Sequence, residues 1–447
     1  MRVLSEIKGN LGNFYEISIN GLSFRKIKIV KVSREYKGYY YLFLLNSQGR
    51  IIQSVFDFLN NYCRNETVNS REQSATALKF LYSFVEILNK KIEDFDSRDI
   101  QNFSCFLQGN NSAGNFLTYK FISQRSISTH NQYFDMIRKY LRYTGIREGG
   151  FFEKKVVSKE RGGYGVLGHT KEVKLEKYTT NKSRHNSFVQ YVPKYISSED
   201  YKKIMNHLKI RDSKHNLRDS IIIKLMYTRG LRLGEVLGLT LEDITEHPDN
   251  SKAGLLYIRN RVSDKKYQCA KGCMKVTTKE DYTTKGYQEE NRGYHTIALP
   301  SDLKRELQQY INISRDIFEL STKKIENMMN GSKADSVVST SNINNYYIFL
   351  NKNGTPLSSA GWSKILKGIF RAVELDIDRE VRKNNLSHRF RHGYAMFLIE
   401  KLKKDISYVK CQMRHRSLQS TMRYFNPTRE KILEESIKIQ EKIKNNL

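Results

Sequence analysis

The chain has 447 residues, enough for two or three domains that each bury a core, and its hydrophobic content of 39% favours globular folding over disorder. It contains no run of about 18 apolar residues that would span a bilayer, and its N-terminus lacks the apolar stretch of a secretory signal. We therefore expect a soluble, cytoplasmic protein with no membrane partner. Lysine and arginine number 77 against 47 aspartates and glutamates, and this net charge of +30, spread along the whole chain, indicates a polyanionic partner. Nucleic acid is the leading candidate, and a ribosome-associated or generally basic protein is the alternative.

The first 62 residues are predicted to be rich in strands. Residues 14–19 and 39–45 are enriched in β-branched and aromatic side chains, and the second run ends at the turn-like sequence of residues 46–49. This region is interpreted either as a small DNA-binding arm domain or as an N-terminal extension.

Residues 66–147 are predicted to form a helical domain. Apolar residues recur there at intervals of three and four, first at Ala77, Phe80, Leu81, Phe84 and Leu88, and again from Tyr133 to Leu141. Thr129 is a candidate cap for the second of these helices. The pattern indicates a compact bundle of roughly four helices.

Residues 148–192 are predicted to be an exposed basic linker, because they are rich in Gly, Lys, Arg and Glu and poor in aliphatic residues. Residues 163–168 match the G-x-G-x-x-G pattern of dinucleotide sites. No buried strand precedes the pattern and no apolar helix follows it, so a basic connection is favoured over a nucleotide site. We expect no cofactor.

Residues 193–447 are predicted to be mainly helical, with a β-rich insert whose strands lie at 255–258 and 295–299, and with a surface loop at 327–345. The fold class expected for the whole chain is mainly α with a small β-sheet (α+β). The five cysteines are scattered and odd in number, which is typical of a reducing compartment. Cys269 and Cys273 form a C-x3-C pair, but no second pair follows at a zinc-ribbon spacing, so we expect no metal.

Three clusters in this last region carry groups suited to phosphodiester chemistry, which needs cations for the phosphate oxygens, a proton for the leaving oxygen and a nucleophile in line. The first cluster spans residues 227–239. Arg232 stands at the start of a predicted helix, where the helix dipole also favours a phosphate, and Glu235 is placed one turn later to hold its guanidinium. An ordinary surface pair at this spacing is the alternative.

The second cluster spans residues 388–395, and the third spans residues 413–424. His388 and Arg391 are three residues apart, so they project from the same face of one helix. Arg391, His392 and the glycine after them also spell the R-H-G of histidine phosphatases. That motif ends an early strand, whereas here it lies late in a helical stretch, so we set it aside. The third cluster ends at Tyr424, which taken alone is an ordinary surface tyrosine.

In this order, the clusters resemble the signature boxes of the tyrosine recombinase (phage integrase) family. The first is similar to the box T-G-L-R-x-x-E-L, the second to H-x-L-R-H, and the third to L-G-H-x(8)-Y, in which His415 and Tyr424 are nine residues apart. The resemblance covers residues 195–427. The helical segment 70–145 resembles the SAM-like core-binding domain of the family, which implies a core-binding domain followed by a catalytic domain.

The resemblance implies a role for each matching residue. Arg232 and Arg391 would clamp the scissile phosphate of double-stranded DNA, His388 and His415 would donate hydrogen bonds to it and assist proton transfer, and Tyr424 would be the nucleophile. The product would be a 3′-phosphotyrosyl enzyme and a free 5′-hydroxyl, formed without ATP or metal.

Supporting residues follow from the same resemblance. Glu235 and His392 would support the arginine clamp. The family also uses a lysine in a β-hairpin between the first two boxes as general acid. That hairpin falls within residues 255–300 and looks enlarged; Lys285 is the first candidate, with Lys275 and Lys279 behind it. For each of these lysines a solvated loop charge is the alternative.

The sequence departs from the family pattern at two positions. Arg229 separates Thr228 from Gly230, which are adjacent in the family box, and Arg414 stands where the family commonly has glycine. Neither change removes a catalytic group. Arg414 either shifts the local backbone or adds a phosphate contact.

The resemblance implies a recombinase that integrates or excises a mobile element as a homo-tetramer on two DNA sites. The segment 429–444 is predicted to be a helix that docks on a neighbouring protomer or, alternatively, packs on its own domain. A type IB topoisomerase-like enzyme and a DNA-binding regulator with a vestigial recombinase fold are the rival functions.

Overall fold

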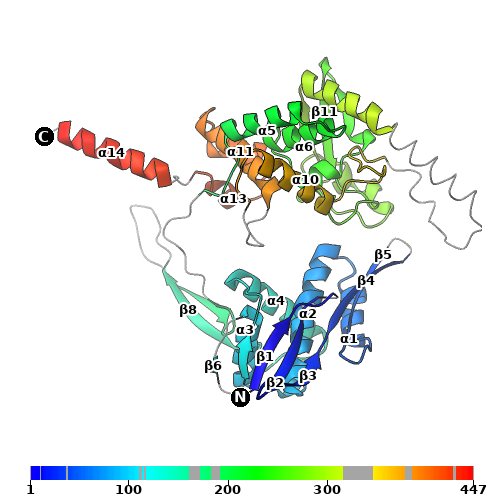
Figure 1. Ribbon diagram of the computed structural model, residues 1–447, viewed down its shortest axis with the longest axis vertical. Helices are drawn as coiled ribbons and strands as arrows, with labels where there is room; N and C mark the ends of the chain where they lie inside the picture. Colours follow the sequence, from blue (N-terminus) through cyan, green and yellow to red (C-terminus); the bar gives the residue numbers. More distant parts are fainter. Residues whose placement is uncertain are drawn as a thin grey trace, which may run out of the picture. The chain divides into compact units, whose positions relative to one another are not determined.

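The computed structural model describes residues 2–10, 12–36, 39–109, 113–114, 117–160, 172–182, 192–315, 346–377, 385–425 and 429–445. The chain divides into two compact units, Met1–Asn186 and Ser187–Leu447 (Figure 1). The G-x-G-x-x-G pattern and the loop expected at 327–345 lie outside the described residues. None of the described helices is long and apolar enough to cross a membrane.

The first unit contains a five-stranded sheet in the order β3-β2-β1-β7-β6, in which β1 pairs antiparallel with β2 and parallel with β7. A separate antiparallel hairpin is formed by β4 and β5. The strands are β1 (Arg2–Ile7), β2 (Phe14–Ile19), β3 (Leu22–Ile27), β4 (Val30–Tyr36), β5 (Tyr39–Leu45), β6 (Ala113–Gly114) and β7 (Leu117–Lys120).

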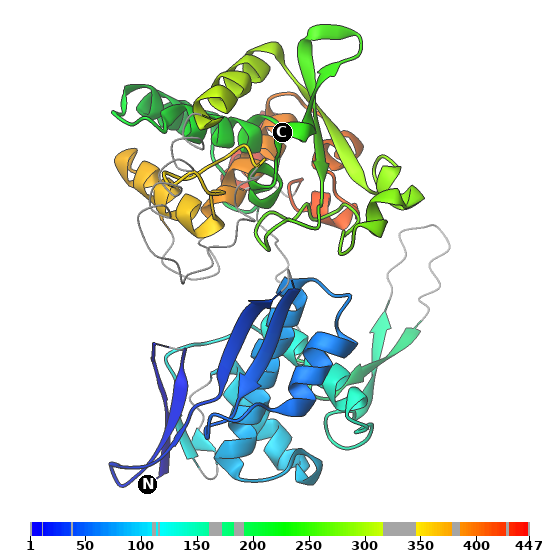
Figure 2. The same cartoon turned by 90° about the vertical axis from the view of Figure 1, so that its right-hand side faces the viewer.

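The helices of the first unit pack against its strands and against one another (Figure 2). They are α1 (Gln53–Asp57), α2 (Val68–Leu88), α3 (Ser97–Gln108) and α4 (Ile127–Tyr143), with a π-helical turn at Phe58–Tyr62 and a 3-10 turn at Ile92–Asp94. The side chain that caps α4 is Ser126, whose hydroxyl accepts from the backbone N–H of Thr129 at 3.3 Å. The expectation that Thr129 is the cap was therefore wrong, because Thr129 already lies inside the first turn.

One core joins the N-terminal strands to these helices. Leu4 and Tyr15 from the sheet are buried in the same cluster as Leu78 and Phe84 from α2 and Phe106 from α3. Alternate residues of β1 and β2 are buried, and an apolar sheet face of this kind needs a layer of helices to cover it. The strand-rich segment and the helical segment therefore fold together.

The stretch expected to be a linker contains regular structure. Strand β8 (Lys154–Glu160) pairs antiparallel with β9 (Glu172–Tyr178). Its inner end is held to the first unit by Arg138 of α4, which donates to the carbonyl of Phe151 and to the side chain of Asn181 at 2.8 and 2.9 Å. The stretch is basic and poor in aliphatic residues, as predicted. The two strands were not predicted, because backbone pairing in a hairpin requires few buried side chains.

The second unit is mainly helical and has a three-stranded antiparallel sheet, β10-β11-β12. Its longer helices are α5 (Ser198–Ile210), α6 (Asn216–Thr228), α10 (Ser359–Ala372), α11 (Leu386–Glu400) and α14 (Arg429–Asn445), and residues 301–315 are also helical. Its short helices are α7 (Leu233–Leu237), α8 (Lys285–Gln288), α12 (Ile406–Gln412) and α13 (Gln419–Met422), with 3-10 turns at Leu241–Asp243 and Glu280–Thr283. Its strands are β10 (Ile244–His247), β11 (Asn250–Arg259) and β12 (Tyr294–Leu299). The expected fold class is confirmed.

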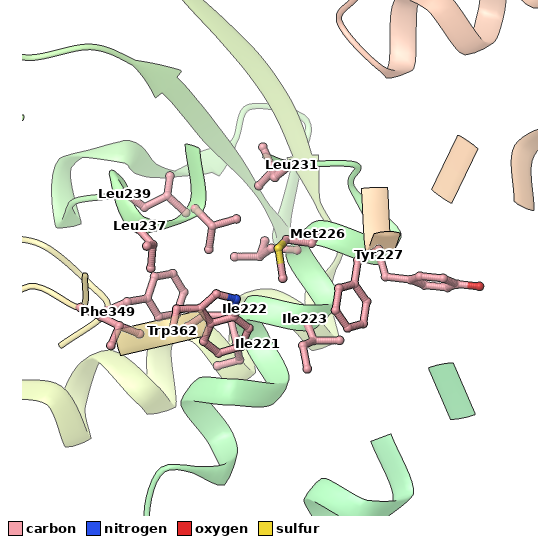
Figure 3. Packing of buried hydrophobic residues seen from close by; sticks show 14 of the residues in the cluster. Ile221, Ile222, Ile223, Met226, Tyr227, Leu231, Leu237, Leu239, Phe349 and Trp362 are labelled. Carbon is pink, nitrogen blue, oxygen red and sulfur yellow. The ribbon is translucent and has the colours of Figure 1, made fainter. Parts of the chain in front are cut away.

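Helix α6 lies in the centre of the second unit and packs against α5 and α11. Figure 3 shows its residues Ile221, Ile222 and Met226 among buried side chains that include Phe349 and Trp362. The indole of Trp362 donates to the hydroxyl of Ser387 at 3.1 Å, which ties α10 to the start of α11. The first and second clusters therefore extend from adjacent, buried helices.

The segment between β11 and β12 is long, as expected, and folds back over α7. The side chain of Asn260 organises it by donating to the carbonyls of Ala270 and Met274 at 3.1 and 2.9 Å. A Cβ atom at Gly238, just after α7, would lie 2.5 Å from the carbonyl oxygen of Gln268. The close approach of this segment to α7 therefore requires glycine at position 238.

Candidate active site

The first cluster places Arg232 beside a buried carboxylate. Arg232 is the N-cap residue of α7; its backbone N–H donates to Glu235 Oε2 at 2.9 Å and its Nη1 donates to Glu235 Oε1 at 2.6 Å. Arg414 Nη2 donates to the same carboxylate at 3.0 Å. Burial alone would raise the pKa of Glu235, but the charges of Arg414, Arg391 and Arg232 outweigh it and lower the pKa to about 2. Glu235 is therefore an anion shared by several arginines.

The second cluster places Arg391 on α11, where it is almost completely buried. Its Nη1 donates to the carbonyl of Gly230 and its Nη2 donates to the carbonyl of Met413. A guanidinium has five N–H groups, so these two bonds leave others for a phosphate. Arg391 thereby holds the first and third clusters together by their backbones.

Gly230 is the point at which the clusters meet. Its φ of +60° lies in the left-handed region, and a Cβ atom there would lie 2.5 Å from a ring carbon of Tyr394. Its carbonyl accepts from Arg391 and also from Arg414 Nη2, the latter at 3.1 Å. This turn requires glycine for both conformation and space.

Arg414, one of the two departures from the family pattern, makes its hydrogen bonds inside this cluster. Its guanidinium faces inward onto Glu235 and backbone carbonyls, and its Nη1 donates to the carbonyl of Arg229 at 3.4 Å. The two residues that depart from the pattern are therefore in contact. Arg414 also has a φ of +49°, a conformation that suits glycine and costs a larger residue energy.

Two histidines contact the nucleophile predicted in the third cluster, and a third histidine contacts one of them. His392 Nδ1 lies 2.7 Å from the hydroxyl oxygen of Tyr424, at hydrogen-bond distance. The rings of His415 and Tyr424 are parallel within 6°, with centroids 6.1 Å apart, and His415 Nδ1 lies 2.9 Å from Thr421 Oγ1. The ring of His388 meets that of His392 edge to face at 5.4 Å. The side chain of Tyr424 is only 3% exposed, so it faces this cluster and not the solvent.

All three histidines are neutral at neutral pH. Burial, assisted by neighbouring positive charges, lowers the pKa of His388 to about 4 and the pKa values of His392 and His415 to about 3. Burial raises the pKa of Tyr424, and the charges of Arg391, Arg423 and Arg232 oppose that rise. A neutral imidazole offers one donor and one acceptor, so each ring can donate to a phosphate or accept a proton.

The structure brings Arg232, Glu235, His388, Arg391, His392, His415 and Tyr424 into this one cluster. Lys285 lies apart from these contacts, on the exposed first turn of α8. The exposed residues Lys275 and Lys279 lie in the same segment.

Lys271 is exposed and lies in a turn of this segment that contacts the third cluster. Its positive charge contributes to lowering the pKa of His388. The carbonyl of the next residue, Gly272, accepts from Arg416 Nη2 at 3.1 Å, so this turn adjoins the third cluster. In sequence Lys271 and Lys285 both precede a glycine, and this local pattern does not distinguish them.

The chain is similar in sequence to a transposase and to tyrosine recombinases. A model described as the phage integrase family matches residues 194–266 and 287–431. Transposase A from transposon Tn554 of Staphylococcus aureus is 27% identical over 286 residues, which cover 61% of this chain and 75% of that protein. The tyrosine recombinase XerH of Campylobacter jejuni is 25% identical over 236 residues, covering 52% of this chain and 48% of that one.

A crystal structure of a XerH site-specific recombinase, in a post-cleavage complex with a palindromic difH substrate, shares the fold. Its TM-score is 0.51 at 18% identity, and the match covers 85% of this chain and 82% of that one. The family model leaves out residues 267–286, which belong to the enlarged segment between β11 and β12. All four lysines considered above, at positions 271, 275, 279 and 285, fall in that gap, so similarity to the family does not choose among them.

Proposed function

Because the chain belongs to the phage integrase family through its second unit, we propose that it is a site-specific DNA recombinase whose nucleophile is Tyr424. One observation carries this proposal. The hydroxyl of Tyr424 lies 2.7 Å from His392 Nδ1 and within the electrostatic reach of Arg391 and Arg232. A tyrosine that only packs at a surface needs neither a buried histidine nor arginines at its hydroxyl.

The arginines would bind and polarise the scissile phosphate. Arg232 and Arg391 offer planar guanidinium donors to its non-bridging oxygens, and Glu235 holds the first of them in place. His388 and His415 are neutral and would donate N–H hydrogen bonds to the same oxygens. The positive charge is thus arranged before the substrate arrives, so little reorganisation is needed as charge develops on the phosphate.

In the cleavage step the oxygen of Tyr424 forms a bond to phosphorus, and the bond from phosphorus to the 5′-oxygen breaks. The products are a 3′-phosphotyrosyl link and a 5′-hydroxyl, whose proton comes from a lysine of the segment between β11 and β12. The electrostatic link to His388 favours Lys271 over Lys285 for that role. Attack by a 5′-hydroxyl of a second duplex reverses the step and rejoins the strand.

We further infer that the reaction serves the movement of a mobile element in the cytoplasm, because one relative is a transposase from a transposon. Assembly of four protomers on two sites would use α14. Leu433, Ile437, Ile439 and Ile443 on this helix are 64%, 47%, 58% and 55% exposed. Docking of this helix on a neighbouring protomer would bury these side chains.

The test is covalent capture on nicked suicide duplexes made from the ends of the element that encodes the chain. The wild type is expected to form a denaturant-resistant DNA adduct, and Tyr424→Phe to bind the same duplex without forming one. Tyr408→Phe is a matched control, because Tyr408 is 42% exposed on α12 and its loss leaves the site intact. Equal adduct from wild type and Tyr424→Phe would refute the proposal.

Two further measurements separate the rival functions. A type IB topoisomerase would relax supercoiled plasmid that carries no recombination site, and a recombinase requires the site. A regulator with a vestigial fold would bind the duplex and form no adduct in any variant.

A further inference from the structure

The sequence pattern implies a supporting role for His392, and the structure places it against the reacting atom. We propose that His392 Nδ1 takes the proton of Tyr424 as the tyrosine oxygen attacks phosphorus. The inference rests on the proposed function, because it needs Tyr424 to be the nucleophile. It goes further by assigning the proton transfer to one of the three neighbouring histidines.

The first support is geometric. His392 Nδ1 and the Tyr424 oxygen are 2.7 Å apart, within the range in which a proton passes directly between two groups. His415 Nδ1 instead lies 2.9 Å from the hydroxyl of Thr421. His388 is in contact with the ring of His392. In this arrangement His388 and His415 are available to donate hydrogen bonds to the phosphate, and His392 lies at hydrogen-bond distance from the nucleophile.

The second support is the rigidity of the position. His392 lies between Arg391, which is bound to two backbone carbonyls, and Gly393, where a Cβ atom would lie 2.4 Å from the carbonyl oxygen of Ile196. The backbone on both sides is therefore fixed by packing. A general base whose backbone is fixed in this way is already positioned next to its proton donor.

The third support is the protonation state. Burial and the charges of neighbouring groups keep His392 neutral, so Nδ1 can accept the hydroxyl proton while Nε2 carries its own. The groups that act on it are His388, Arg423, Arg391 and His415. In the free protein the positive charges of Arg423 and Arg391 oppose a positive His392. A phosphate bound among the arginines adds negative charge, which stabilises the protonated form of His392.

The proposed step balances. A lone pair of the Tyr424 oxygen forms the bond to phosphorus, and the proton of that oxygen passes to His392 Nδ1. The electrons of the breaking bond go to the 5′-oxygen, which takes a proton from the hairpin lysine. During rejoining His392 returns its proton to the departing tyrosine oxygen.

The test measures single-turnover adduct formation on the suicide duplexes with the full-length chain. His392→Ala is expected to bind DNA normally and to form adduct about 10² to 10⁴ times more slowly than the wild type. Added imidazole is expected to restore part of the rate, because a small base can enter the space left by the ring. His392→Asn, which keeps a polar group but accepts no proton, should be slow as well. His247→Asn, at the end of β10, is the control and should match the wild type.

The outcomes separate this inference from the proposed function. If the wild type forms no adduct, the proposed function fails. If the wild type forms adduct and His392→Ala forms it as fast or faster, His392 is not the proton acceptor. A slow His392→Ala that folds, binds DNA and gains nothing from imidazole would also overturn the inference, because that result describes a purely structural residue.

Discussion

Replacing Glu235 by glutamine removes a buried negative charge. Arg232 and Arg414 form ion pairs with this charge, and Arg391 interacts with it electrostatically. The folded structure lowers the pKa of this carboxyl from 4.5 to about 2. By linkage, a shift of that size corresponds to about 3 kcal/mol of folding free energy at neutral pH, in line with the cost of breaking a buried ion pair. Because the folded-state pKa is the lower one, the contribution is complete above pH 4.5 and is lost as the pH falls towards 2.

The second unit can be followed by itself, since the chain has a single tryptophan and Trp362 is buried in the core of that unit. Denaturant unfolding monitored by its fluorescence should show Glu235→Gln about 3 kcal/mol less stable than the wild type at pH 7. The two proteins should converge as the pH is lowered below 4.5. Glu242→Gln is the matched control, because the exposed pair of Glu242 with Arg259 contributes at most about 1 kcal/mol. A loss below about 1 kcal/mol for Glu235→Gln, or a loss that does not change with pH, would refute the reasoning.

Other changes test the rest of the site. Arg414→Ala should be about 1 kcal/mol less stable than Arg414→Gly, because both lose the guanidinium but only glycine adopts a φ of +49° at little cost; equal stabilities in the fluorescence assay would contradict this. Lys271→Ala should slow adduct formation more than Lys285→Ala does. Replacing the bridging 5′-oxygen of the scissile phosphate by sulfur should restore the rate of Lys271→Ala, because a thiolate leaves without being protonated. A greater loss of rate for Lys285→Ala would reverse the assignment. Gly393→Ala should cost about 2 kcal/mol in the same unfolding assay, because its Cβ would meet the backbone of Ile196, and unchanged stability would show that the helix shifts freely.

Local chemistry and spacing were enough to predict the reacting groups. Arg232, Arg391 and Tyr424 belong to motifs whose order and intervals are read directly along the chain. Helical periodicity located α2 and α4, because an apolar stripe repeats at the period of the helix itself. The enlargement between β11 and β12 was also evident, since the segment is too long and too polar for a tight turn.

The sequence did not show which elements pack against the apolar face of the N-terminal sheet. Residues 14–19 were predicted to be a strand, and only the folded structure shows that α2 and α3 complete one core with β1 and β2. Strand pairing between β8 and β9 was missed for a related reason, because hydrogen bonds between backbones leave little trace in composition.

The sequence by itself determined which groups are available for the proposed chemistry, because the motifs that resemble the family place arginines, histidines and a tyrosine at fixed intervals along the chain. The tertiary structure decided which of those groups are in contact. Gly272, next to Lys271, accepts from Arg416, Arg414 joins the cluster around Glu235, and His392 lies at hydrogen-bond distance from the hydroxyl of Tyr424, each through contacts between separate segments of the chain. Such contacts depend on how helices and loops pack, and no local period or spacing records that packing.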